Sequence, residues 1–469
     1  MIERMTAHAP EIRPDGMVLF PEVLGRFLTD QIAEAHVSVL SQTHRGYLRQ
    51  KEVEFYPVDM TEEEWQEALR KDERLAMNNT LVSRRWKPLF TSRGLEAISY
   101  LDRGSGFRDI HLAIADSLDH LSRLYLGLPD EDLVRSVNEI LARGFRTGDT
   151  DEAMRDFINL RTLPRYSIGA FLQERLLDKT RNLKFAYEGW SSEENRYLSA
   201  RFNVWAWRLL LDVGKPSDSQ FIVCDSAGQA GIATEFIWQG NTMPSQTEIG
   251  MTFGHKIFFF DNVSVWKAAK YIEPKLRVIT PPSILDRMNN GSFDKVRRAV
   301  IAGHEVGHAA QKIPEGADLR LGRWYQTVKE LYADAFALWA IFRRPEIIIT
   351  RDDIIPAVYF DVARHLTKIE EYKMRVVEEG KDARDVIDPY PYSAAIKLNT
   401  LIEQGALTFQ GDTYFVVDRD DLRVIRKVIE GYITELDKLI VGGTQIEAED
   451  FIKSRSSTPV DYLAPVLPK

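Results

Sequence analysis

The stretch AVIAGHEVGHAAQK, residues 299–312, constrains the chain more than any other segment. Its apolar residues recur with helical spacing, and one row at intervals of four ends in His304 and His308, so both histidines are expected to face the protein interior. A buried imidazole needs a partner. Residues four apart lie one helical turn from each other, so the two imidazoles can bind one metal ion with Glu305 beside it. The segment therefore predicts a helix that carries a metal site.

This His-Glu-x-x-His pattern is typical of zinc metallohydrolases. Zn²⁺ binds neutral imidazole nitrogens, and it activates water whose proton a nearby carboxylate can accept. We therefore predict that His304 and His308 bind Zn²⁺ and that Glu305 is the general base. The same pattern arises by chance in roughly one chain in a hundred of this length, so the surrounding sequence has to support it.

A catalytic zinc site needs a third protein ligand, and a second predicted helix at residues 324–344 offers candidates. In TVKELYADAFALWA, Glu330 and Asp334 lie on one face that continues toward the core, where carboxylates are costly unless they bind something. We assign Glu330 to the metal and Asp334 to the N–H of a ligating histidine, whose tautomer it would fix. A solvated helix face is the alternative. No third histidine follows His308 by six residues, which excludes a metzincin.

The order of these motifs resembles the dipeptidyl-peptidase III family of zinc exopeptidases. The resemblance rests on HEVGH, KELYADAFALWAI and PYSAAIKLNTLIEQGALTFQGDTYFVVD, with a further similar stretch, EFYPVDMTEEEW, at residues 54–65. It is closest to the shorter branch of the family, which in plants is fused to a Nudix domain and shares the spacing of HEVGH. The resemblance implies a two-lobed α+β fold that is predominantly α. A helical zinc lobe and a smaller β-containing lobe would enclose a cleft, with His304, His308 and Glu330 as ligands and Glu305 as base.

The same resemblance singles out two further residues. Where the family has a histidine that donates to the developing oxyanion, this chain has Tyr392, which follows Pro391 at a predicted helix start. A tyrosine can donate to an oxyanion, and a helix start favours negative charge, so we expect Tyr392 to be catalytic. The alternative is a buried aromatic side chain. Where the family has a tyrosine near the cleft, this chain has Trp190, which we expect to bind substrate.

In the rest of the chain the sequence pattern changes from helical to β-rich and back to helical. Residues 20–180 are mostly helical in pattern and include TEEEWQEALRK, a predicted helix from Thr61 with a capping box. Residues 215–285 hold the β-rich runs QFIVCDSAG, ATEFIWQG, KIFFFDNVSVW and KLRVITPP, which predict a small sheet or partial barrel. Helices at 294–312 and 324–344, a hairpin around Gly411-Asp412 and a last helix from Asp420 follow. We divide the chain into an N-terminal helical and β-rich lobe, residues 1–285, and a mostly helical catalytic lobe, residues 286–469.

Charge and hydropathy exclude several classes of partner. The net charge is −9 and no long Lys/Arg block occurs, so we expect neither nucleic acid nor a membrane surface as partner. The apolar run AFALWAIF is too short to span a bilayer, and the N-terminus does not look like a secretory signal, so we expect a cytoplasmic protein. Cys224, the single cysteine, is expected to be buried rather than nucleophilic.

Three functions stay open from the sequence. The leading one is a zinc-dependent exopeptidase that acts on short peptides. The same machinery could instead hydrolyse a non-peptide metabolite amide or ester. A non-catalytic zinc-containing binding protein is the third, although the presence of Glu305 argues against it. The glycine-rich pieces GSGF and DSAGQAG lack the lysine of a phosphate-binding loop and are expected to be turns.

Overall fold

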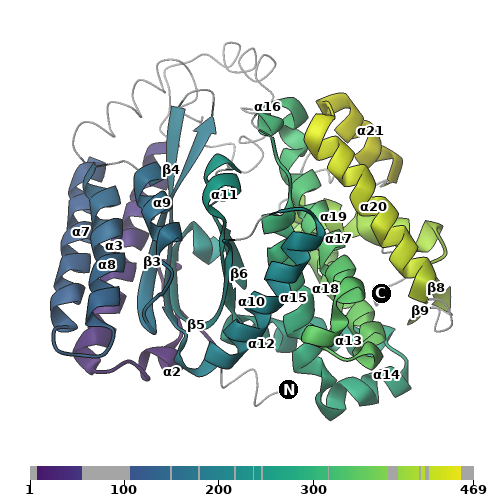
Figure 1. Cartoon of the computed structure of the whole chain (residues 1–469), viewed down its shortest axis with the longest axis horizontal. Coiled ribbons are helices and arrows are strands. Elements are labelled where there is room, and N and C mark those ends of the chain that lie inside the picture. Colours follow the sequence, from purple (N-terminus) through teal and green to yellow (C-terminus); the bar gives the residue numbers. More distant parts are fainter. Residues whose placement is uncertain are drawn as a thin grey trace.

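The computed structural model describes residues 8–54, 106–147, 150–177, 180–215, 218–235, 237–244, 247–314, 316–378, 389–410, 414–417 and 422–455. The helix predicted from Thr61, the turn Gly411-Asp412 and Asp420 lie outside these residues. Within them the protein is predominantly helical with a smaller mixed sheet, which confirms the α+β class (Figure 1). No described helix combines the length and the apolar character that crossing a membrane requires.

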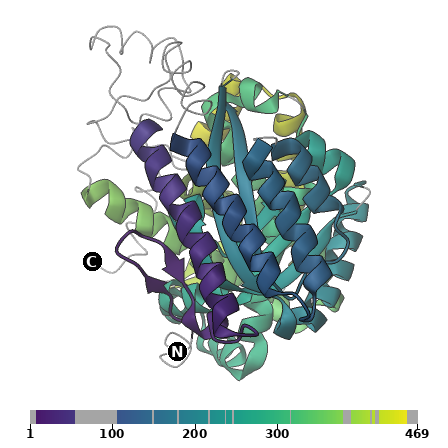
Figure 2. The same ribbon diagram turned by 90° about the vertical axis from the view of Figure 1, so that its left-hand side faces the viewer.

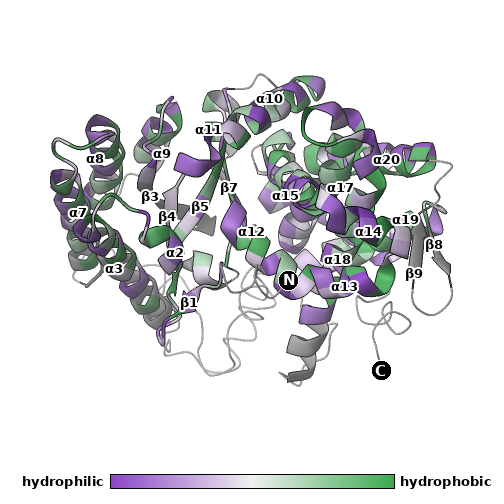
Figure 3. Ribbon diagram, turned by 90° about the horizontal axis from the view of Figure 1, so that it is seen from below, coloured by the Kyte–Doolittle hydropathy of each residue, from purple (hydrophilic) through white to green (hydrophobic). Residues whose placement is uncertain are grey.

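Four helices cover one side of the N-terminal part: α3 (Asp30–Glu54), α7 (Gly106–Leu124), α8 (Glu131–Thr147) and α9 (Thr150–Asn159). Figure 2 shows them in front of the sheet, and contacts join α3 to β4 and β5, and α8 to β3. In α8 the buried side chains of Val134, Val137 and Leu141 recur at intervals of three and four, as one covered face requires. Figure 3 shows hydrophobic and hydrophilic residues on different sides of these helices. They enclose the core of the smaller lobe.

The sheet of this lobe contains a long hairpin that the sequence pattern did not predict. Strands β3 (Tyr166–Leu177) and β4 (Thr180–Ser191) pair antiparallel along their whole length. The sheet continues through β5 (Gln220–Gly231) and β2 (Val18–Leu19) to β1 (Glu11–Ile12). The mostly helical pattern expected up to residue 180 is therefore wrong at its end, because pairing with β4 outweighs the local helix preference of a segment such as LQERLL.

Strand β5 also begins a second part of the sheet, which lies between the two cores. Its first half pairs parallel with β7 (Lys256–Phe260), and β7 pairs antiparallel with β6 (Gly240–Met243). Successive β7 side chains point to opposite faces, so Ile257 and Phe259 belong to the C-terminal core while Phe258 and Phe260 belong to the N-terminal core. A strand that is apolar at consecutive positions is thus buried on both faces.

Three stretches in this region differ from their predicted form. KLRVITPP lies mainly in helix α13 (Glu273–Ile279), where buried Leu276 and Ile279 have helical spacing, and ATEFIWQG holds the end of a short 3-10 helix, Ile232–Glu235. DSAGQAG is the second half of β5 rather than a turn. A Cβ at Gly228 would lie 2.6 Å from Cδ1 of Leu40, so the glycine is needed for close packing of α3 on the strand. Cys224 is fully buried in β5, as predicted.

The C-terminal part is a group of helices around a larger core. Its elements are α10 (Arg196–Asp212), α12 (Asp261–Lys267), α13, α14 (Pro282–Arg287), α15 (Phe293–Ala310), α16 (Ala317–Leu321), α17 (Tyr325–Arg343), α18 (Ile354–Glu378), α19 (Pro389–Glu403), α20 (Leu422–Gly442) and α21 (Gln445–Arg455), with hairpin β8 (Leu407–Gln410) and β9 (Tyr414–Val417). The short helix α11 (Thr247–Phe253) packs instead on the N-terminal core, through Ile249 and Phe253. Both predicted motif helices are confirmed as α15 and α17, and the hairpin as β8 and β9. The boundary at residue 285 stays a prediction, since α10, β5 and β7 also contribute to this core.

Candidate metal centre

Helix α15 brings the His-Glu-x-x-His motif into the interior and is held at both ends. Gly291, with a φ of 112°, makes the left-handed bend that precedes the helix. At the other end the buried Lys215 donates hydrogen bonds to the carbonyl oxygens of Ala309, at 2.7 Å, and Gln311, at 2.6 Å. A cation at this position satisfies carbonyls that the helix leaves unpaired and complements its dipole.

Two glycines of the motif helix set its distance from α17. A Cβ at Gly303 would lie 3.0 Å from Cα of Ala337, and one at Gly307 would lie 2.8 Å from Cα of Ala333. The two helices therefore meet backbone to backbone, with small residues on both sides of the contact. This close approach positions Glu330, one turn before Ala333, opposite the motif histidines.

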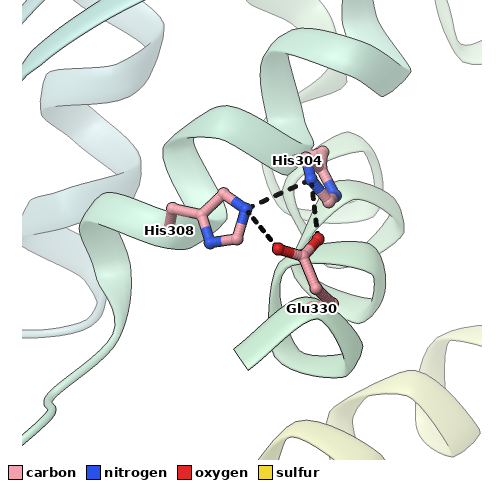
Figure 4. Close-up of side chains that lie close together, drawn as sticks. All are labelled: His304, His308 and Glu330. Carbon is pink, nitrogen blue, oxygen red and sulfur yellow. Dashed lines mark hydrogen bonds and ion pairs between the residues drawn. The ribbon is translucent and has the colours of Figure 1, made fainter. Parts of the chain in front are cut away.

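His304, His308 and Glu330 point toward one common place (Figure 4). Nε2 of His304 lies 3.2 Å from Nε2 of His308 and 3.5 Å from Oε2 of Glu330. Nε2 of His308 lies 3.7 Å from Oε1 of Glu330. Among the described residues this is the one group of three metal-binding side chains with such mutual proximity. The structure thus brings together the three residues that the sequence assigned to the metal.

These separations fit a tetrahedral zinc ion. Bonds of about 2.0–2.1 Å at tetrahedral angles place neighbouring ligand atoms about 3.3 Å apart, close to the 3.2 Å between the two imidazole nitrogens. The contacts of Glu330 at 3.5 and 3.7 Å are made by different oxygens, and with one ligand atom from each residue all three atoms lie within 4.8 Å of one another. Oε2 of Glu330 is buried and accepts no hydrogen bond from the described part of the chain, as expected of an atom reserved for a metal. The side chains keep 10–19% of their surface exposed, so the centre has an open side.

Burial shifts the pKa values of all three predicted ligands. It lowers the pKa of His304 to about 4 and that of His308 well below its usual value, so both imidazoles are neutral at pH 7. Burial also raises the pKa of Glu330. A neutral imidazole is the form that binds Zn²⁺, and a metal ion would favour the ionised carboxylate of Glu330.

Glu305 lies beside the three ligands and against β6. Its Oε2 accepts a hydrogen bond from Oγ1 of Thr242 at 3.0 Å, and a Cβ at Gly240 would lie 2.7 Å from its Oε1. Burial raises the pKa of Glu305 to about 8, which the hydrogen bond from Thr242 opposes. The charge of a bound metal would lower this pKa again. The carboxylate is therefore fixed in place and able to exchange a proton near neutral pH.

Asp334 lies fully buried behind the ligands. Its Oδ1 is 2.8 Å from Nδ1 of His304, where the sequence analysis placed it, and it also accepts a hydrogen bond from Arg364. Its Oδ2 is 3.2 Å from Nε2 of His365 and accepts a hydrogen bond from Ser393 at 3.1 Å. Contact with Nδ1 directs the other ring nitrogen of His304 toward the metal position.

The sequence analysis missed most of this charged network. Asp361, Arg364, His365 and Lys368 follow one another on α18, and Lys397 reaches Asp361 from α19 at 2.6 Å. A signal was present, because the four α18 residues have the spacing i, i+3, i+4 and i+7 of a single helix face. A polar stripe on an otherwise apolar helix indicates a buried partner.

The two residues proposed from the family resemblance lie in apolar surroundings. The ring of Tyr392 packs edge-on against Trp324 at 6.1 Å in the C-terminal core, and its role as oxyanion donor stays a prediction. Trp190 is 1% exposed and packs against Phe258 at 5.0 Å in the N-terminal core. A side chain enclosed in this way offers a substrate no surface, so the position of Trp190 does not support its predicted contact with substrate.

The structure is similar to solved structures of dipeptidyl-peptidase III. No family model and no curated protein matches the sequence. The structure of the enzyme from Caldithrix abyssi matches 99% of this chain and 97% of its own, with 14% identity and a TM-score of 0.64. That from Corallococcus sp. strain EGB matches 98% and 94%, with 14% identity and a TM-score of 0.68. At this identity the likeness concerns the fold, and the chain therefore has a dipeptidyl-peptidase III-like fold, as its motifs predicted.

Proposed function

We propose that the protein is a zinc-dependent exopeptidase that hydrolyses short peptides. This proposal rests on the geometry of the position that His304, His308 and Glu330 surround. Two neutral imidazoles and a carboxylate surround it at mutual distances of 3.2–3.7 Å, and a further carboxylate, Glu305, adjoins it. A structural zinc site has no use for that fourth group, whereas a hydrolytic site needs it.

Each residue of the site has a separate role in the proposed hydrolysis. When bound, Zn²⁺ would supply Lewis-acid chemistry, polarising a carbonyl and making water acidic. Glu305, held by Thr242, accepts the proton of the attacking water and later returns it to the departing amine. Asp334 keeps the ring of His304 in the orientation and tautomer that the metal requires.

The dipeptidyl-peptidase III-like fold supports a peptide as substrate, because both compared structures carry that enzyme's name. We therefore propose short peptides rather than a metabolite amide or ester. We further propose that the protein acts in the cytoplasm, without nucleic acid or membrane as partner, in keeping with its net charge of −9.

The test is hydrolysis of a library of short peptides by the purified, zinc-loaded protein, with products identified by mass spectrometry. Glu305→Gln should retain zinc and lose about 10²- to 10⁴-fold in rate, because an amide cannot accept the proton. Glu403→Gln, the same substitution at an exposed glutamate of α19, serves as the control and should behave as wild type. Cleavage of a non-peptide amide without any peptide cleavage, or a fully active Glu305→Gln, would contradict the proposal.

A further inference from the structure

Helix α10 is held in place by its inner face. That face packs into the C-terminal core through Phe202, Trp205, Ala206, Leu209 and Leu210. The side-chain amide of Asn203 also exchanges two hydrogen bonds with the backbone of Phe221, each at 2.6 Å. These contacts account for the position of the helix without any contribution from its outer face.

The outer face carries exposed apolar side chains in a heptad pattern. Four large ones are 48–73% exposed: Tyr197, Val204, Trp207 and Leu211. Tyr197, Val204 and Leu211 follow one another at intervals of seven, and Trp207 follows the exposed Ala200 at the same interval. They thus occupy positions a and d of two successive heptads, as in the contact face of a coiled coil. We call these five residues the α10 seam.

The α10 seam is too concentrated to be a random part of the surface. Single exposed apolar residues are normal, whereas a contiguous row of them is typical of an interaction site. Among the described residues eleven large hydrophobic side chains are exposed, and four of them lie on this helix. Figure 3 shows α10 at the outer edge of the molecule. The seam extends over about 21 Å, which is the length of about four turns of a second helix.

The charges that border the α10 seam are positive. Arg201 and Arg208 each follow a d residue directly, at position e of the heptad. Arg201 donates a hydrogen bond to the carbonyl oxygen of Ile347 at 2.6 Å, and its guanidinium lies 5.9 Å from the centre of the Tyr197 ring. Within the described part of the chain neither arginine pairs with a carboxylate. The seam therefore offers two unneutralised cations to whatever binds there.

This charge pattern does not fit a second copy of the chain. In an antiparallel pair of coiled-coil helices the e positions face each other, so Arg201 of one copy would lie against Arg208 of the other. In a parallel pair Arg196, at position g, would lie against Arg201. Like charges at these positions oppose pairing. An anionic membrane is disfavoured as well, because it repels a protein whose net charge is −9.

We propose that the α10 seam binds an acidic amphipathic helix of a partner protein. Apolar side chains of that helix pack on the seam, and acidic side chains beside them pair with Arg201 and Arg208. Trp207 is the expected anchor, because tryptophan and arginine dominate the binding energy of interfaces. Since α10 is already held by its inner face, little conformational entropy is lost on its side when the partner binds. The inference does not depend on the hydrolytic function proposed above.

The first test uses a synthetic peptide of about three heptads as the probe. It has leucine at a and d, glutamate at e and g to prevent pairing with itself, and a lactam bridge on its outer face that keeps it helical. Fluorescence anisotropy with the full-length protein should show binding, and a matched peptide with lysine at e and g should bind at least about tenfold more weakly. No binding of the acidic peptide up to about 1 mM, or equal binding of both peptides, would overturn the proposal.

The second test changes the seam itself. Trp207→Ala should weaken binding of the acidic peptide at least about tenfold and keep the urea midpoint of unfolding, because Trp207 belongs to neither core. Leu126→Ala, which removes an exposed apolar side chain outside α10, is the matched control and should bind as wild type. Arg208→Glu should weaken binding of the acidic peptide and strengthen binding of the basic one. An unchanged preference in Arg208→Glu, or wild-type affinity in Trp207→Ala, would overturn the proposal.

The third test addresses the two other occupants. The protein alone is examined by sedimentation, and its binding to vesicles of phosphatidylcholine and phosphatidylserine is examined by flotation. We expect neither a dimer nor vesicle binding that depends on Trp207. A wild-type dimer that Trp207→Ala converts to monomer would assign the seam to a second copy, and vesicle binding that Trp207→Ala abolishes would assign it to a lipid surface. Either result would overturn the proposal.

Discussion

Gly307→Ala should damage the metal centre without touching a ligand. Its new Cβ would lie 2.8 Å from Cα and 3.0 Å from the carbonyl oxygen of Ala333. Ordinary carbon contacts are about 3.5–4.0 Å, so α15 and α17 must separate by roughly 0.7 Å or more. Glu330 lies one turn from Ala333 and would be carried away from His304 and His308 by the same movement.

The size of the effect follows from the cost of overpacking. Adding one methyl group to a closely packed interior costs typically about 1–3 kcal/mol. Zinc binding requires the two helices to return to their native distance, so this strain opposes it. At 1.36 kcal/mol for each factor of ten, the strain weakens zinc binding by about 5- to 150-fold. The greater helix propensity of alanine, about 1 kcal/mol, offsets part of the loss in stability but not the loss in zinc affinity.

The assay is competition between the protein and a graded series of zinc chelators, together with urea unfolding of the apoprotein. Gly431→Ala is the matched control, because Gly431 lies in helix α20 with no other atom within 4 Å of its would-be Cβ. That control should gain up to about 1 kcal/mol of stability and keep the wild-type zinc Kd. If Gly307→Ala behaved in the same way as Gly431→Ala, the helix contact would not set the ligand positions.

Two further substitutions test the electrostatics. Asp334→Asn should raise the zinc Kd about 10- to 100-fold, because the carboxylate that orients His304 becomes an amide, and an unchanged Kd in the chelator series would detach Asp334 from the centre. Asp261→Asn should cost about 3–5 kcal/mol at pH 7, because the carboxylate pairs with Arg297 at 2.8 Å and Arg298 at 2.7 Å. Burial alone would raise the pKa of Asp261, but the two guanidinium groups hold it well below its usual range. The difference between wild type and Asp261→Asn should therefore be full above about pH 4 and shrink as the pH falls further; a difference that is constant from pH 7 to pH 3 by circular dichroism would refute this.

The candidate metal centre could be predicted from the sequence because its geometry is local. The i, i+4 spacing of His304 and His308 fixes their relation within one helix, and the same spacing relates Glu330 to Asp334 in the next. Only the distance between the two helices depends on non-local contacts. Gly303 and Gly307, which lie in the motif segment, set that distance because they allow α17 to approach closely.

The missed features depend on contacts between distant segments. The β3–β4 hairpin is held by antiparallel pairing along both strands. The residue pattern within either strand does not predict this pairing. The buried partners of Asp334 come from α18 and α19, so their role appears only once these helices are packed together. Trp190 was placed near a substrate by resemblance alone, whereas the fold puts it beside Phe258 in the core.

The central claim is that His304, His308 and Glu330 hold one zinc ion, and X-ray absorption at the zinc edge tests it most directly. The protein loaded with one equivalent of zinc should show two imidazole nitrogens and oxygen ligands at about 2.0–2.1 Å, without sulfur. His308→Ala should lose one imidazole from that spectrum, and the double variant His304→Ala/His308→Ala should retain no stoichiometric zinc. Equal zinc content in wild type and the double variant, or an unchanged imidazole count in His308→Ala, would contradict the account.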